Sequence, residues 1–349
     1  VSTACPRLKE NQIVNKMDKN CEVVVTSISD LGAPSQPVRK IPRMVKFVRF
    51  ARQILSTDTP VTLVDIPRSD FDEACVVLEC ARQQGLHDIS DCLLVLKKAA
   101  EQLVGRESAG TLVDAWYHID EAYDHLSHTG LDLIMYGCQH QRWINRPFVL
   151  FPMELKEEDR SYYRRYQFQA LTEEESNDLM NLQGIEGVRG FTAVFMLTET
   201  MKKAIRSIST AISEITILAN TAADSESRHK FLLFKKRLEV ERCFFRNVIH
   251  AAQFQELVDR TDFETPPVRM LRWPTRNDSR IEEYQNIMRS EIDNSYELAG
   301  LLEEDLEEVL LCTVPEKEDI FVFSTDFAHQ MIHKAEIMLN HMSDGSRVY

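Results

Sequence analysis

The sequence predicts an all-α protein, a multi-helix bundle of long antiparallel helices with minor short extended segments. Mostly apolar residues recur with unbroken 3-4 spacing from Phe191 to Ala219, and only a helix gathers such positions onto one stripe. Because the heptad is sustained, the stripe is expected to face another helix, as in a coiled coil. The same rhythm returns from Phe231 to Ala252 with one charged interruption, at Glu241. The chain also has only 11 Gly and 12 Pro in 349 residues, which favours long helices over a turn-rich β protein.

The first half of the chain is expected to contain several shorter helices. An irregular N-terminal segment, 1–38, contains a β-branched run at 22–28 that predicts a strand. An N-terminal helical region follows over 39–183, with an extended connector at 60–67 and an extended apolar piece at 147–152. Pro42, the Gly85 stop, Gly105 and Gly130 divide this region into helices near 43–55, 69–84, 88–105, 111–127, 131–142 and 154–170, and the capping box of Thr172 and Glu175 predicts another short helix.

The second half is predicted to be a long-helix bundle over 191–349. Gly184, Gly187 and Gly190 make 184–190 a Gly-containing hinge before it. Helices are expected at 191–219 and 225–260, and the short loop between them makes them antiparallel neighbours. A third helix begins with a capping box at Ser279 and Glu282 and runs to about 309, and a last helix spans about 325–342.

Charge is distributed unevenly along this acidic chain, whose net charge is −14. That charge argues against a surface devoted to nucleic acid, because phosphate binding needs a basic footprint. Residues 31–57 contain no acid and six cations, whereas 290–319 contains eleven acids against Lys317. The two segments are interpreted either as two solvated surfaces or as segments that attract each other within or between chains.

The basic segment predicts an amphipathic helix over 39–55, with one apolar and one basic face. Its functional interpretation is a docking surface for an acidic protein, for this protein itself, or for an anionic lipid or nucleic-acid surface. The plainer alternative is a helix whose apolar face packs into its own core. The candidate partner-binding residues are Arg39, Lys40, Arg43, Lys46, Arg49 and Arg52.

Candidate metal ligands lie on the predicted last helix, where Asp326, His329 and His333 share one face. A carboxylate and two imidazoles suit zinc or iron, and a helical bundle can complete such a site from other helices. Since no other helix carries a matching Glu-x-x-His motif, structural or surface histidines are favoured, and neither metal nor cofactor is predicted. Nucleophile motifs are also absent, so no catalytic residue is predicted.

Cysteine usage predicts an intracellular, reducing, cytoplasmic location, because the eight cysteines are scattered, without Cys-x-x-Cys spacing. The polar start at 1–19 does not resemble a signal peptide, and no apolar run reaches transmembrane length.

The leading functional hypothesis is a non-enzymatic helical scaffold or adaptor for protein–protein interaction or self-assembly. Residues 191–219 would supply rigidity, and 39–52 and 291–319 the charged docking surfaces. The alternatives are a peripheral membrane or anionic-ligand-binding bundle that uses helix 39–55, and a helical metal-dependent enzyme.

Overall fold

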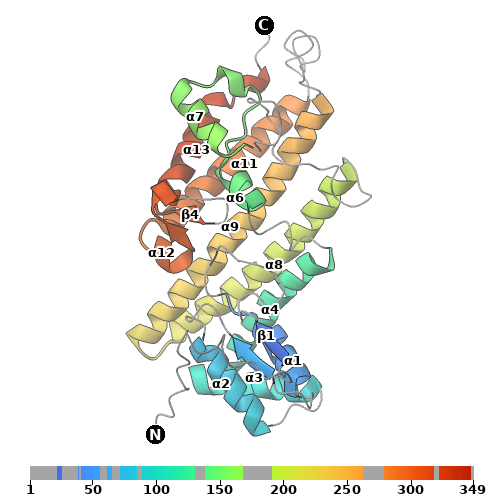
Figure 1. Cartoon of the computed structure of the whole chain (residues 1–349), viewed down its shortest axis with the longest axis vertical. Helices are drawn as coiled ribbons and strands as arrows, with labels where there is room; N and C mark the ends of the chain where they lie inside the picture. The colour runs from blue at the N-terminus through green and yellow to red at the C-terminus, as the bar shows by residue number, and fades with distance from the viewer. Residues whose placement is uncertain are drawn as a thin grey trace.

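The computed structural model describes residues 22–25, 38, 41–55, 61–64, 71–84, 89–129, 138–167, 191–261, 279–317 and 322–346. Within these ranges the predicted all-α class is confirmed, and the strands form only two short parallel pairs. Figure 1 shows an elongated bundle in which α1 to α4 lie at one end and α6, α7, α11 and α13 toward the other. Helices α8 and α9 run between the two groups.

Helices α8 (Phe191–Thr221) and α9 (Ser225–Thr261) form the predicted antiparallel hairpin. At a rise of 1.5 Å per residue, 31 and 37 residues give lengths of about 46 and about 55 Å. Asp224 caps the start of α9, because its carboxylate accepts the backbone N–H and the hydroxyl of Ser227, each at 2.8 Å. The predicted stripe on α8 is buried from Val194 to Ala219, apart from the partly exposed Ile205.

A second row of buried residues on α8 explains why it packs against two helices. Leu197, Ala204, Ala211 and Leu218 recur every seven residues beside the predicted stripe, and each is at most 2% exposed. The apolar face is therefore wide enough for both α9 and α4, which pack along α8. Alanine at two of the four positions lets neighbouring backbones come close.

The N-terminal group consists of α1 (Met44–Leu55), α2 (Phe71–Gln84), α3 (Ile89–Val104) and α4 (Ala109–His128). Gly105, with φ of 82°, ends α3 as predicted, in the left-handed conformation that glycine adopts without strain. The strand predicted within 22–28 is β1 (Glu22–Val25), and it pairs in parallel with β2 (Val61–Val64), which lies in the expected connector 60–67.

The C-terminal group contains α6 (Cys138–Asn145), α7 (Glu157–Arg165), α11 (Ser279–Leu302), α12 (Leu306–Val309) and α13 (Phe327–His341). A short pair, β3 (Cys312–Thr313) and β4 (Phe323–Ser324), lies between α12 and α13. Three 3-10 turns complete this group, at Pro152–Glu154, Pro315–Lys317 and Asp344–Ser346.

The predicted third long helix does not continue to 309, because α11 ends at Leu302 and a turn separates it from α12. Five carboxylates occur between Glu303 and Glu308. Carboxylates at the C-terminal end of a helix oppose its dipole and repel one another, so the helix breaks where they begin. The sequence prediction missed this break because it followed the apolar positions alone.

One continuous apolar core runs through both groups and the hairpin, from Phe47 of α1 and Trp116 of α4 to Phe254 of α9 and Met331 of α13. A smaller cluster of Tyr162, Tyr163 and Ile337 joins α7 to α13. None of the described helices combines the length and apolarity that crossing a membrane requires.

Candidate functional site

The predicted basic face is located on α1, and its apolar opposite face is buried as expected. Met44, Val45, Phe47 and Val48 are each at most 3% exposed. Of the six candidate partner-binding residues, Arg49 is exposed, and Lys46 and Arg52 are partly exposed. Arg39 and Lys40 lie outside the described residues.

Arg43 belongs to the interior rather than to the basic face, because it is only 2% exposed. Its Nε atom lies 3.2 Å from Oδ1 of Asp120, and its Nη2 lies 2.9 Å from Oδ1 of Asp124, both on α4. The guanidinium also lies 5.0 Å from the centre of the Tyr123 ring. Arg43 therefore attaches the start of α1 to α4.

Asp120 also supplies the helix cap that α1 lacks. The first turn of α1 contains no acidic residue, and Oδ2 of Asp120 accepts the backbone N–H of Val45 at 2.9 Å. Burial raises the pKa of Asp120 to about 6, although the Arg43 guanidinium and the N–H of Val45 act in the opposite direction. The sequence reasoning did not find this role for Asp120.

A second cluster of buried polar groups joins four helices around Glu291 of α11. Glu291 and Lys334 of α13 form an ion pair in which neither side chain is exposed. Asn247 of α9 donates to Oε1 of Glu291 at 2.7 Å, and Nδ1 of His250 lies 2.7 Å from its Oε2. Burial would raise the pKa of Glu291, but Lys334 and His250 hold it below its ordinary value.

The same cluster caps the C-terminal end of α6. The Lys334 ammonium donates to the carbonyl of Ile144 at 2.8 Å, and Asn247 donates to that of Trp143 at 3.2 Å. The Tyr162 hydroxyl of α7 donates to the Asn145 carbonyl at 3.0 Å. These carbonyls belong to the last turn of α6, which has no partners within its own helix. The arrangement therefore positions α6 against α7, α9 and α13.

Two acids of the segment 290–319 form ion pairs with arginine and lysine side chains of α9. Glu297 lies 3.1 Å from Arg242 and 2.5 Å from Arg246, and Asp305 pairs with Lys236. Asp293, Glu303, Glu304, Glu307 and Glu308 remain exposed. These ion pairs join the acidic segment to α9 and not to the basic segment 31–57, so attraction between the two predicted segments stays a prediction.

The acidic segment also lies close to the start of the basic one. Val38 forms an isolated antiparallel bridge with Leu310, at the end of α12, and both residues are fully or almost fully buried. This contact places the chain that enters α1 against the acidic part of the C-terminal group.

The candidate metal ligands lie at the start of α13, where Asp326 and His329 are exposed. The third, His333, is partly buried. Its ring packs edge-on against Tyr162 at 4.9 Å, and its Nε2 lies 3.6 Å from Asp159. Within the described ranges, no three His, Cys, Asp or Glu side chains gather as metal ligands would.

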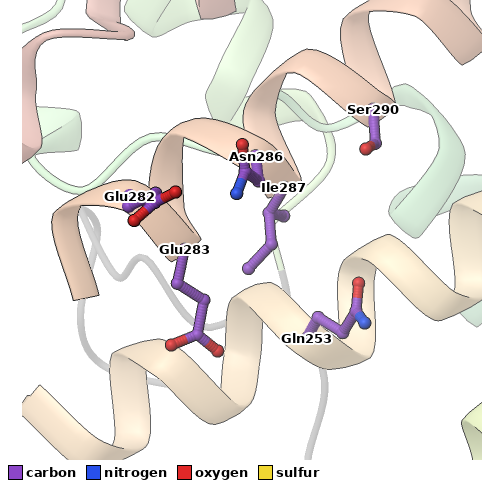
Figure 2. A pocket seen from close by; sticks show the side chains of 6 residues that line it. All are labelled: Gln253, Glu282, Glu283, Asn286, Ile287 and Ser290. Atoms are coloured by element: carbon purple, nitrogen blue, oxygen red, sulfur yellow. The ribbon is translucent and has the colours of Figure 1, made fainter. Parts of the chain in front are cut away.

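A groove of about 530 Å³ lies between α9 and α11. Figure 2 shows Ile287 and Glu283 of α11 pointing toward α9, and Gln253 of α9 pointing back toward α11. Glu282, Asn286 and Ser290 complete its lining. Five of its six lining residues have polar side chains, two of them carboxylates, so the groove favours a cationic or hydrogen-bonding group over an anion.

Comparison of the chain with protein-family models, curated proteins and solved structures gives no match.

Proposed function

We propose that this protein is a non-enzymatic helical scaffold that presents charged helix surfaces to another protein. The observation that supports this is the shared hairpin: α4 packs along α8, while α6, α11 and α12 pack along α9. A single rigid element therefore carries both groups. Buried ion pairs outside the hairpin attach helices to one another: Arg43 joins the start of α1 to α4, and Lys334 joins α13 to α11.

The basic face of α1, made of Lys46, Arg49 and Arg52, is the proposed docking surface of the N-terminal group. Its partner is an acidic protein surface, since opposite charges steer association and set orientation. The exposed acids of α11 and α12 are the corresponding surface of the C-terminal group. They suit a basic partner or the basic face of a second copy.

A charge-reversal pull-down tests this proposal. The variant Lys46→Glu/Arg49→Glu/Arg52→Glu is expected to lose a partner that the unmodified protein captures at low salt. Its control is Lys156→Glu/Arg289→Glu/Lys317→Glu, which makes the same change of charge at exposed cations elsewhere. The control should retain that partner, and both variants should keep the helical circular dichroism of the unmodified protein.

Identical captures by the two variants would refute the assignment to α1. Flotation with anionic and neutral vesicles tests the alternative partner, an anionic membrane surface. If α1 binds lipid, the protein should float with the anionic vesicles and not with the neutral ones. Such binding, lost in the α1 variant alone, would replace the protein partner with a membrane surface.

A further inference from the structure

The carboxyl group of Glu241 lies buried on α9, where the Tyr123 side chain of α4 contacts this helix. Glu241 is only 1% exposed, and it follows the fully buried Leu238 by one helical turn. The Tyr123 hydroxyl of α4 donates to its Oε1 at 3.0 Å. Its Oε2 is buried and has no hydrogen-bond partner among the described residues.

The charges around Glu241 are already used by other groups. On the α4 side, Arg43 is held by Asp120 and Asp124. The cations of α9 near Glu241 also have other partners: Arg242 and Arg246 pair with Glu297, and Lys236 pairs with Asp305. The buried guanidinium of Arg237 donates to the backbone carbonyl of Glu308.

The other helices packed on α9 do not supply a cation to Glu241 either. Of the described residues of α8, the buried ones are apolar, Thr or Ser. Lys334 of α13, beside α6, is paired with Glu291. The ionised form of Glu241 thus has one neutral hydrogen-bond donor and no counter-ion within the described part of the chain.

We propose that proton uptake by Glu241 stabilises the packing of α4, and with it α1, against the α8–α9 hairpin, and that release of this proton loosens this packing. A buried carboxylate without a cation is costly, and it becomes neutral by binding a proton. Burial accordingly raises the pKa of Glu241 to about 7, and the Tyr123 hydroxyl lowers it only in part.

Tyr123 is the side chain that connects the Glu241 carboxyl to α4, on which it lies, and to Arg43 at the start of α1. Its ring packs edge-on against Phe245 of α9 at 6.3 Å and carries the Arg43 guanidinium at 5.0 Å. Tyr123 itself is 1% exposed. A change in charge at its hydroxyl partner therefore acts where α4, packed along α8, also contacts α9, next to the guanidinium that attaches α1.

The direction of the pH effect follows from linkage. The attached state has a pKa of about 7 for Glu241 and the detached state has the ordinary value of 4.5, so only the attached state holds the proton between these values. Attachment strengthens as the pH falls from about 7 toward 4.5, and it is weakest above pH 7. Asp120, with its raised pKa, acts in the same direction at lower pH.

Hydrogen exchange tests the proposal on the intact protein. After correction for the intrinsic exchange rate, protection of the α4 amides is expected to fall about tenfold between pH 6 and pH 8. Glu241→Gln should remove most of this change and match or exceed the unmodified protein at pH 8. The control is Glu239→Gln, which neutralises a partly exposed carboxylate paired with Lys235. It should leave the tenfold change intact.

A pH dependence that persists unchanged in Glu241→Gln would overturn the proposal. Infrared spectroscopy gives a second readout that does not depend on how well the variant folds. The difference spectrum between pH 6 and pH 8 of the unmodified protein should contain the C=O band of a protonated carboxyl. Glu241→Gln should lose most of this band and keep only the smaller part that comes from Asp120, whose pKa is about 6. Absence of that band from the unmodified protein would also refute the proposal.

Discussion

Two kinds of buried charge occur in this protein, and their chemistry differs. Glu291 has an ammonium and an amide donor on one oxygen and His250 on the other, so the fold favours its ionised form. Glu241 has a single neutral donor. The first group fixes helices in place as an ion pair, although burial lowers the pKa of Lys334. The second makes a contact that loses its proton near neutral pH.

The Lys334→Met variant should be strongly destabilised. It leaves Glu291 buried without its cation, and removing one partner of a buried ion pair costs about 3–5 kcal/mol of the free energy of unfolding. The double variant Glu291→Leu/Lys334→Met should recover part of that loss, since it buries no unpaired charge. Urea denaturation measures both changes. A single variant within about 1 kcal/mol of the unmodified protein would show that the pair does not hold the helices together.

The burial of these ions could be predicted in part from the sequence. Glu291 follows the buried Met288 by three residues, and Lys334 follows Met331 by three, so each lies on the apolar face of its helix. That spacing is a signal for a buried ion, but Glu291 was assigned to the acidic surface because acids surround it in the chain. The pairing itself was not predictable, because it depends on how α11, α13 and the end of α6 pack.

At the scale of elements, two sequence signals predicted helices well: long heptad stripes of apolar residues, and a glycine at the end of a helix. The stripe gave α8 and its antiparallel partner α9, and Gly105 gave the end of α3. Two features were missed for different reasons. The pairing of β2 with β1 requires a partner strand, which the local pattern does not show. The end of α11 at Leu302 follows from adjacent carboxylates that oppose the helix dipole, and attention to the apolar positions alone overlooks them.

A pair of glycine substitutions tests the stop after α3. Gly105 has φ of 82°, where an alanine is strained, so Gly105→Ala should lower the free energy of unfolding by about 1 kcal/mol. Gly300 lies inside α11, and a Cβ there meets no heavy atom within 4 Å. Gly300→Ala should therefore raise stability by about 0.5–1 kcal/mol. Thermal denaturation of both variants gives the comparison, and equal effects of the same sign would contradict it.

At the scale of the whole molecule, the hairpin makes one body of elements that are far apart in the chain. Helix α6 precedes the predicted hinge at 184–190, yet it packs against α9 and α13. The hinge lies outside the described residues, so the boundaries 39–183 and 191–349 stay predictions. The continuous core through α4, α8, α9 and α11 nevertheless favours joint unfolding of the two groups. If either group unfolded alone, the apolar face of the hairpin that it covers would be exposed to water.

Two tryptophans test this coupling, since each reports on one group. Trp116 lies in α4 and Trp143 in α6, with 1% and 3% exposure. Two variants each keep only one of them, with the other tryptophans changed to Phe. At pH 6, where most of Glu241 is protonated, the urea midpoint from tryptophan fluorescence should coincide in each variant with the midpoint from circular dichroism of the same variant. At pH 6, a transition at a lower urea concentration for Trp116 would mean that α1 to α4 unfold from the hairpin on their own. At pH 8 such an earlier transition is expected, because the ionised Glu241 weakens the contact with α4.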